Sequence, residues 1–457
     1  MTVAKNTGLS RRAFGKGVLA SAFAFQFVPS HVWGANERLT VAGIGVGGKG
    51  SGDIDQAGNY ADVVAICDID DERLKAKAKR FSSAKPFHDF RELLDTMGDK
   101  LDAVTVSTAD HTHAAAAVAA MQLGKHVYCQ KPLTHTVAEA RLMRETARKY
   151  GVVTQMGNQG MALDGFRANV ELVRSGALGN VREVHVWTNR PFRNWATGEM
   201  YWKQSPDLTA RPKETPPVPD HVHWDLWLGP SPERPYHPIY HPRNWRGWWD
   251  FGTGALGDMA CHTTAMPFLA LELGLPTRVS AVSGEVNPET YPAWANITYE
   301  FPARGNTPPV KLVWYEGVRD GQRNIPDLPL PRGLTASESG SFLVGEKGRL
   351  YSPGDSGNTQ ELDIPGGFKV PEPIFHRWGD NNNDEMQKRE WMTAIQGGAR
   401  PLSNFDFASV LTETMLLGNV AVRLGKAIEY NGEHGRVTNV AEAVSLLSPP
   451  RRNGWGF

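Results

Sequence analysis

Lys131, Asp258 and His262 are the side chains whose types and spacing best suit acid–base chemistry. Lys131 stands directly before Pro132, after an apolar run typical of a buried strand. Pro cannot donate to a sheet ladder, so the strand must end here, and α/β proteins bind ligands at such strand ends. A helix would place Asp258 and His262 on one face, where the carboxylate would raise the imidazole pKa and orient the ring as a base. The alternatives are a solvated lysine, and a capping Asp beside a buried His.

A glycine-rich loop follows the first apolar run. It fits the pattern G-x-G-x-x-G with Gly45, Gly47 and Gly50. Such glycines let backbone N–H groups approach a pyrophosphate at a helix N-terminus. Asp68 ends the next apolar run about 20 residues later, where a carboxylate binds a ribose diol. The acidic side chain favours NAD, because a 2′-phosphate would meet like charge; NADP is the alternative, since basic residues follow on the next helix.

The elements that position these residues alternate as β-α-β-α-β. Apolar runs at 39–44, 61–70 and 101–108 are separated by helical patterns, and two more strands are expected before residue 160. We therefore predict an α/β fold with an NAD-binding Rossmann domain over 36–160. Polar residues follow several of its strands and are expected at the cofactor crevice: His113, Gln130 and Asn158.

The remaining residues, 161–457, predict a second, α+β domain with an open, largely antiparallel sheet. Segments with alternating hydrophobicity, such as 294–301, are separated by turn residues. Residues 405–428 predict an amphipathic helix. Between residues 190 and 256 the chain is rich in Trp, Pro and Gly and has little periodicity, and a loop of this length in a compact domain is usually functional.

Residues 1–35 predict a twin-arginine export signal. Arg11 and Arg12 precede an apolar run too short to span a bilayer. We expect export of the folded protein to the periplasm by the twin-arginine machinery, with an uncleaved membrane anchor as the alternative. No later segment predicts a membrane span.

Charge balance and residue spacing argue against nucleic-acid binding, disulfides and a metal site. Lys and Arg number 49, as do Asp and Glu, so no global charge favours nucleic acid. The three cysteines fit neither a disulfide nor a zinc framework and are expected to be buried apolar residues. Two His-x-His pairs, His111–His113 and His221–His223, lack Cys or acidic ligands at zinc spacing, so we expect no metal.

Three motifs together resemble the glucose–fructose oxidoreductase / inositol dehydrogenase (Gfo/Idh/MocA) family: STADHTH, GKHVYCQKP and GDMACH. The resemblance implies that Lys131 bridges a substrate hydroxyl and the cofactor, His262 takes the hydroxyl proton, and Asp258 holds His262 or the substrate. It also implies a cis peptide before Pro132 and a homo-oligomer built through the second sheet. The chain departs from the family pattern at Gln130, where Glu is usual, and at Ala109, where Pro is usual.

The aromatic segment suits a sugar, because Trp and Tyr faces stack on pyranose C–H groups while Arg and His bind hydroxyls. The candidate substrate-binding residues are Arg193, Trp195, Tyr201, His241, Trp245 and Arg246. Alternatively, these aromatic residues fill a domain or subunit interface.

Three functions follow. The first is an exported NAD(P)-dependent oxidoreductase acting on a sugar or sugar derivative by hydride transfer. The second is a glycoside hydrolase or lyase that oxidises its sugar transiently with a captive NAD, with His241 or Tyr201 as an extra base. The third is a non-catalytic, NAD-containing carbohydrate-binding protein.

Overall fold

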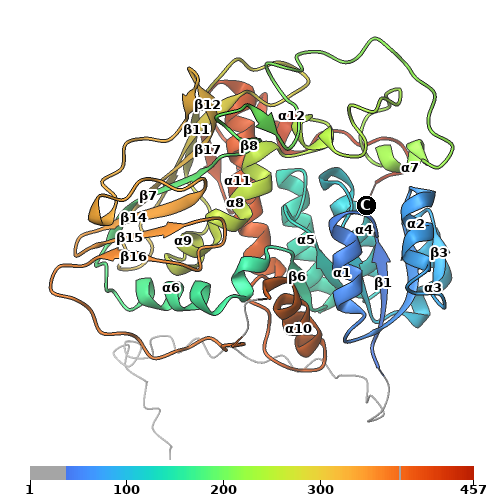
Figure 1. Cartoon of the computed structure of the whole chain (residues 1–457), viewed down its shortest axis with the longest axis horizontal. Helices are drawn as coiled ribbons and strands as arrows, with labels where there is room; N and C mark the ends of the chain where they lie inside the picture. Colours follow the sequence, from blue (N-terminus) through green and yellow to red (C-terminus); the bar gives the residue numbers. More distant parts are fainter. Residues whose placement is uncertain (1–37, 380–381, 457) are drawn as a thin grey trace, which may run out of the picture. The chain divides into compact units, whose positions relative to one another are not determined.

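Six parallel strands form the sheet of the N-terminal half in the computed structural model, which describes residues 38–379 and 382–456 (Figure 1). Their order is β3-β2-β1-β4-β5-β6, the order of a doubly wound dinucleotide-binding sheet. The strands are β1 (Thr40–Ile44), β2 (Asp62–Cys67), β3 (Lys85–Phe87), β4 (Ala103–Val106), β5 (His126–Cys129) and β6 (Thr154–Met156). This confirms the predicted Rossmann fold. The predicted export signal lies outside the described residues.

The helices of this half lie on both faces of the sheet and have clear end signals. Asp70 caps α2 by accepting from the backbone N–H groups of Glu72 and Arg73. Thr136 and Glu139 form a capping box at the start of α5. The helices are α1 (Lys49–Ala57), α2 (Asp71–Ala78), α3 (Phe90–Met97), α4 (His113–Gln122) and α5 (Val137–Tyr150).

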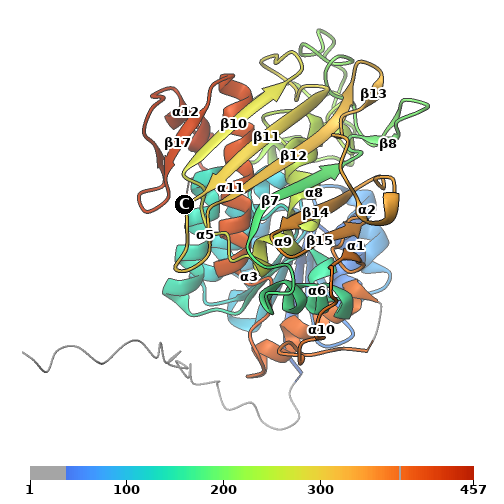
Figure 2. The ribbon, with the colours of Figure 1, turned by 90° about the vertical axis from the view of Figure 1, so that its left-hand side faces the viewer.

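The second half contains a ten-stranded sheet that is antiparallel except where β7 and β12 pair (Figure 2). Its order is β16-β15-β14-β7-β12-β11-β10-β17-β18, and β13 pairs with β12. The prediction of a largely antiparallel second sheet is confirmed. The strands are β7 (Val181–Thr188), β10 (Arg278–Ser283), β11 (Trp294–Phe301), β12 (Val310–Arg319), β13 (Gln322–Arg323), β14 (Gly340–Gly345), β15 (Arg349–Pro353), β16 (Glu361–Asp363), β17 (Ile428–Asn431) and β18 (Arg436–Val437); β8 (Phe192–Asn194) and β9 (Glu199–Met200) form a separate hairpin.

Helices α8 and α11 cover one face of this sheet, and α11 also packs against α5 of the Rossmann half (Figure 2). α11 is long and apolar enough to cross a membrane, but 83% of its apolar window is buried inside the fold, so it is a core helix here. The expected amphipathic face is therefore absent from α11, which is buried on most sides. The helices are α6 (Asp164–Arg174), α7 (Trp224–Leu228), α8 (Gly254–Thr263), α9 (Ala265–Ala270), α10 (Asn383–Ile395), α11 (Phe405–Leu424) and α12 (Ala443–Leu447).

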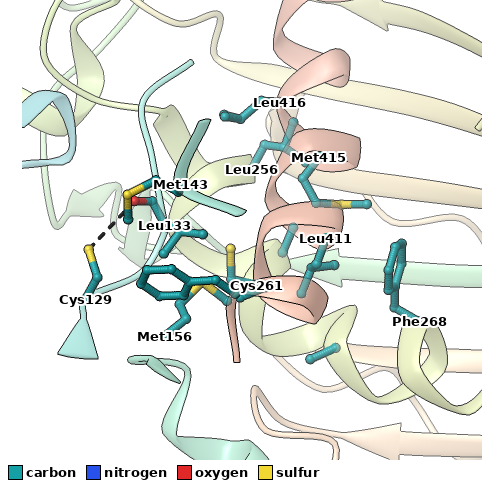
Figure 3. Close-up of a cluster of buried hydrophobic side chains, with 14 of the residues drawn as sticks. Cys129, Leu133, Met143, Met156, Leu256, Cys261, Phe268, Leu411, Met415 and Leu416 are labelled. Carbon is teal, nitrogen blue, oxygen red and sulfur yellow. Dashed lines mark hydrogen bonds between the residues drawn. The ribbon is translucent and has the colours of Figure 1, made fainter. Parts of the chain in front are cut away.

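Buried cysteines lie in the core that joins the two halves. Figure 3 shows Cys129 of β5 and Cys261 of α8 among apolar side chains that include Leu411 of α11. All three cysteines of the chain are buried and free. The expectation that they act as small apolar residues is confirmed.

Helix α10 belongs to the core of the N-terminal half although it follows the second sheet in sequence. Trp391 and Met392 pack in one buried cluster with Val41 and Ile66 of the Rossmann sheet. The backbone from Arg38 onward clusters as one compact unit. Residue 160 therefore does not mark the end of the chain's contribution to the cofactor half.

Candidate functional site: a dinucleotide pocket beside a lysine–aspartate pair

The glycines of the G-x-G-x-x-G pattern leave no free space for a Cβ atom. A Cβ at Gly45 would lie 2.7 Å from the carbonyl oxygen of Ser107, and one at Gly50 would lie 1.9 Å from that of Gly45. Gly45 also has a φ of +79°, which favours glycine. At Gly47, a Cβ would lie 2.3 Å from Cδ of Arg73. This bare backbone is what a pyrophosphate needs for close approach.

Asp68 follows β2 and contacts the same loop. Its Oδ2 accepts hydrogen bonds from the backbone N–H groups of Val46 and Gly47, each at 2.9 Å. Burial raises the pKa of Asp68, although nearby Arg73 opposes the rise. Arg73 itself pairs with Asp70 at 3.5 Å. The carboxylate thus stands beside the glycine loop, where a cofactor ribose is expected.

A pocket of about 610 Å³ opens at the carboxyl ends of β1, β2, β4 and β5. Gly45, Gly47 and Asp68 line one part of it, and Gln130 and Lys131 line another. The missing Cβ atoms, the ribose-side carboxylate and the volume fit a nicotinamide dinucleotide.

Lys131 leaves β5 and pairs with Asp258 of α8. Its Nζ lies 2.6 Å from Oδ1 of Asp258 and 3.1 Å from the carbonyl oxygen of the same residue. Arg246 approaches Asp258 at 3.4 Å and Arg190 at 3.9 Å. Burial opposes ionisation, but Lys131 and Arg246 outweigh it and hold the pKa of Asp258 well below its usual range. The peptide before Pro132 is cis, as the family resemblance implied.

His262 lies one turn beyond Asp258 on α8, as the spacing predicted, but its electrostatics differ from the prediction. Among the described residues, no hydrogen bond joins the two side chains. Burial, and then the charge of Lys131, lower the pKa of His262 to about 3, although Asp258 acts to raise it. The expectation of a raised pKa was wrong because burial of the ring and the charge of Lys131 together outweigh the effect of Asp258. His262 is therefore neutral near pH 7 and can accept a proton.

Gln130 lines the pocket and contacts a buried acidic residue that the sequence analysis did not single out. Its Nε2 donates to Oδ2 of Asp53 at 2.8 Å, and its Oε1 accepts from the backbone N–H of Lys131 at 3.3 Å. Asp53 in turn binds Nζ of Lys388, from α10, at 2.8 Å. This chain of contacts fixes the turn that carries Lys131.

His113 and Asn158 were expected to contact the cofactor, but both are buried and do not line the pocket. The ring nitrogens of His113 lie 2.8 Å from the carbonyl oxygen of Pro132 and 3.1 Å from that of Thr108. Asn158 donates to the carbonyl oxygen of Cys261 at 3.0 Å. Both side chains therefore position backbone: His113 the turn after Lys131, and Asn158 the helical turn that bears His262.

The six candidate substrate residues separate into two groups. Trp245, Arg246 and His241 line the pocket, although the charges nearest His241 are those of Arg73 and Asp70, at the Asp68 end. The other three lie on or beside the β8–β9 hairpin and are not part of the pocket wall: Arg193, Trp195 and Tyr201.

Two models of one protein family match this chain. Residues 38–158 match the model of the Gfo/Idh/MocA oxidoreductase family, NAD-binding Rossmann fold, and residues 166–307 match its C-terminal alpha/beta domain. The two matches span more than half of the chain. The chain belongs to the Gfo/Idh/MocA oxidoreductase family.

Curated relatives that are named sugar or polyol dehydrogenases match about a third of this chain. Inositol 2-dehydrogenase of Salmonella typhimurium is 30% identical over 148 residues, which cover 31% of this chain and 43% of that protein. D-glucoside 3-dehydrogenase of Escherichia coli is 33% identical over 136 residues, covering 30% and 37%. The chain thus spans less than half the length of these relatives.

A solved structure shares its fold with most of the chain. A dehydrogenase from Bordetella pertussis, solved in complex with NADH and UDP-GlcNAcA, superposes with a TM-score of 0.59 at 17% identity, covering 86% of this chain and 99% of that one. At this identity the likeness concerns the fold alone.

The sequence analysis did not identify two further residues of this site, Asp110 and Arg190. Asp110 receives two hydrogen bonds at 3.1 Å from Arg246 and one of 2.6 Å from the Thr253 hydroxyl, and so holds the start of α8. Arg190 joins the site through Asp258 and stacks 4.3 Å from the Tyr201 ring. Asp110 stood in the quoted STADHTH motif, but nothing in the sequence reveals its partners, more than a hundred residues away.

Proposed function

We propose that this protein is an NAD-dependent oxidoreductase that oxidises a CH–OH group of a sugar or sugar derivative. The observation that carries the proposal is the position of Lys131. Lys131 lines the dinucleotide pocket, and its ammonium group binds Asp258, one helical turn from His262. One lysine therefore connects the cofactor pocket with a carboxylate and a neutral imidazole.

Each of these groups has a defined part in handling the substrate hydroxyl. Bound NAD⁺ supplies the hydride acceptor. Lys131 has three N–H donors, and Asp258 occupies two of them through Oδ1 and the main-chain carbonyl. The third is available to the substrate oxygen and stabilises the negative charge that develops there. Neutral His262 takes the hydroxyl proton on a ring nitrogen.

Asp258 keeps this arrangement in one charge state. Its low pKa means that it stays ionised through the physiological range, and its hydrogen bond orients the Lys131 side chain. Arg246 and Arg190 add positive charge around the same carboxylate. The site is thus built to stabilise an oxyanion.

A sugar or polyol suits the pocket wall. Trp227 and Trp245 supply flat apolar faces, and Arg246 supplies donors for hydroxyl groups. The names of the relatives, which act on inositol and on glucosides, support this class. We also propose export through the twin-arginine pathway and a homo-oligomeric state, both of which rest on the sequence and the family resemblance.

The test begins with the purified protein. It is denatured, and the released nucleotide is identified and its redox state recorded. The intact protein is then incubated with NAD⁺ and a panel of polyols, aldoses and glycosides, with NADH absorbance as the readout. Net NADH formation, lost in Lys131→Met, supports the proposal. Glycoside cleavage without net change in NAD redox state would replace it with the captive-cofactor alternative, and sugar binding that survives Lys131→Met without turnover would leave a binding protein.

A further inference from the structure

Two histidines and an aspartate that are far apart in sequence meet beside the end of β2. His88 follows β3, Asp71 begins α2, and His223 comes from the long segment 201–253. His88 Nε2 lies 3.3 Å from Asp71 Oδ1, and His223 Nε2 lies 3.5 Å from the same oxygen. All three potential ligand atoms lie within 4.8 Å of one another.

The hydrogen bond made by Nδ1 of His88 determines whether Nε2 of the same ring can act as a metal ligand. Nδ1 of His88 lies 3.0 Å from the carbonyl oxygen of Asp68, which can only accept, so Nδ1 carries the proton. In the neutral ring Nε2 then presents a lone pair to the carboxylate of Asp71. Two acceptors that face each other need a cation or a proton between them.

The rings of His88 and His223 are stacked, with centroids 4.0 Å apart, and each has its Nε2 near the same carboxylate oxygen of Asp71. A single divalent ion at this point would contact both imidazole nitrogens and the carboxylate at once. The Nδ1–H bond from His88 to a backbone carbonyl is also the arrangement that orients most metal-binding histidines.

The two separations from Asp71 Oδ1 agree with a tetrahedral ion. Zinc binds His nitrogen at about 2.0–2.1 Å and carboxylate oxygen at about 2.0–2.2 Å, which places neighbouring tetrahedral ligands about 3.3–3.4 Å apart. The two separations from Asp71 Oδ1 are 3.3 and 3.5 Å. We propose that His88 Nε2, His223 Nε2 and Asp71 Oδ1 bind a zinc ion, with a fourth position open to water.

The sequence led us to expect no metal here, because the acidic ligand comes from a segment distant in sequence that folding brings close. The His221–His223 pair has no acidic ligand nearby in sequence, but an antiparallel bridge between Asp70 and Val222 brings it against α2. The backbone N–H of His223 donates to the carbonyl of Ile69 at 2.9 Å, and that of Asp71 to the carbonyl of His221 at 2.9 Å.

Bound zinc fastens the segment 201–253 to the cofactor half. Residues of that segment line the dinucleotide pocket, among them Trp227, His241, Trp245 and Arg246. His88 lines the pocket too, and its Nδ1 partner is the main chain of Asp68. The ion therefore clamps the wall of the pocket near Asp68, and we expect it to slow the release of bound dinucleotide.

The experiment uses the full chain after removal of metal with EDTA. Zinc is added, excess is removed by dialysis, and bound zinc is measured by mass spectrometry and by titration calorimetry. We expect one zinc ion per chain, and at least about tenfold weaker binding in both His88→Asn and His223→Asn, since even residues behind the ligands change affinity by that much. The variants lie on separate segments, so a folding defect in one leaves the other informative.

Two matched histidines serve as controls. His221→Asn alters the neighbouring group of Asp70, Glu72 and His221, where Nε2 of His221 lies 4.0 Å from Asp70, and His434→Asn alters an exposed surface histidine. Both should bind zinc as the unaltered protein does. A second readout is dinucleotide release, which zinc should slow in the unaltered protein and leave unchanged in His223→Asn. Absence of zinc binding, equal binding by His88→Asn and His223→Asn, or loss only in His221→Asn would overturn the proposal.

Discussion

The side-chain amide of Gln130 donates a hydrogen bond to the carboxylate of Asp53, with 2.8 Å between Nε2 and Oδ2. Asp53 and its partner Lys388 expose no side-chain surface. The family pattern usually has Glu at the position of Gln130. In this chain the negative charge belongs instead to the buried Asp53, which Gln130 contacts. Lys388 and Lys49 lower the pKa of the Asp53 carboxyl in spite of its burial.

We expect Lys388→Met to destabilise the protein by about 3 kcal/mol, because breaking a buried pair leaves an uncompensated charge. The free energy of unfolding from urea titration measures this. Adding Asp53→Asn to the variant should recover part of the loss, and Lys79→Met, on an exposed face of the chain, should change little. Equal stability of Lys388→Met and Lys79→Met would show that the pair contributes nothing.

Lys131→Met should lower kcat/KM for the oxidised sugar by about 10²–10³-fold, the usual cost of removing one donor to a developing oxyanion. The dinucleotide content of the protein should stay the same, since the glycine loop and Asp68 are unaltered. Lys125→Met, at a half-buried position before β5, is the matched control. Full activity in Lys131→Met would remove the lysine from the mechanism.

The acid limb of the pH profile reports His262. Its pKa of about 3 predicts that kcat/KM does not fall between pH 8 and pH 5, unlike that of an enzyme whose base has an ordinary imidazole pKa of about 6.5. Removing the charge of Lys131 should move this limb to higher pH. His262→Gln should lower kcat by about 10²–10⁴-fold and abolish the limb. An acid limb near pH 6.5 in the unaltered protein would contradict the electrostatics described here.

Gly50 and Gly52 lie two residues apart in α1 and provide a paired test of the cofactor loop. A Cβ at Gly50 would lie 1.9 Å from the carbonyl oxygen of Gly45, whereas a Cβ at Gly52 meets no atom within 4 Å. Gly50→Ala should therefore displace the loop and abolish dinucleotide binding. Gly52→Ala should bind normally and stabilise the helix by about 0.5–1 kcal/mol. Calorimetry with NAD⁺ distinguishes the two; normal binding by Gly50→Ala would mean that the loop is not the pyrophosphate site.

Glu316 makes stability depend on pH. Burial raises its pKa to about 7 from the ordinary value of 4.5, although a 2.8 Å hydrogen bond from Trp314 opposes the rise. The folded state thus holds the proton more tightly, so the stability from this group is complete below pH 4.5 and is lost as the pH rises through 7. Glu316→Gln keeps an acceptor for Trp314 without the charge. Relative to the unaltered protein, it should gain on the order of 2–3 kcal/mol at pH 8, and a gain independent of pH would refute the assignment.

The sequence was informative where a residue's role depends on its local pattern. The order of apolar runs and glycines predicted the Rossmann sheet and placed Lys131, Asp68 and the loop at one edge. Strand β3 was missed because it is a three-residue edge strand containing Pro86. The pattern could not give the direction of side chains at strand ends, so it did not reveal that His113 and Asn158 face away from the pocket.

Contacts between distant segments were beyond the sequence for a different reason. Asp53 and Lys388 are 335 residues apart, and no periodicity relates them. The pKa of His262 likewise depends on its burial and on the nearby charge of Lys131, which only the folded chain determines. The spacing identified the pair and the direction in which Asp258 shifts the imidazole pKa, but not the burial that outweighs this shift.

The return of α10 to the N-terminal half has a consequence for how the protein is made. Trp391 and Met392 complete the apolar core under the dinucleotide sheet, and Lys388 supports the residues below the glycine loop. While a ribosome is still synthesising the middle of the chain, the first half has emerged without this helix. The nascent first half cannot close its core at that stage, so cofactor capture must wait until translation has passed α10.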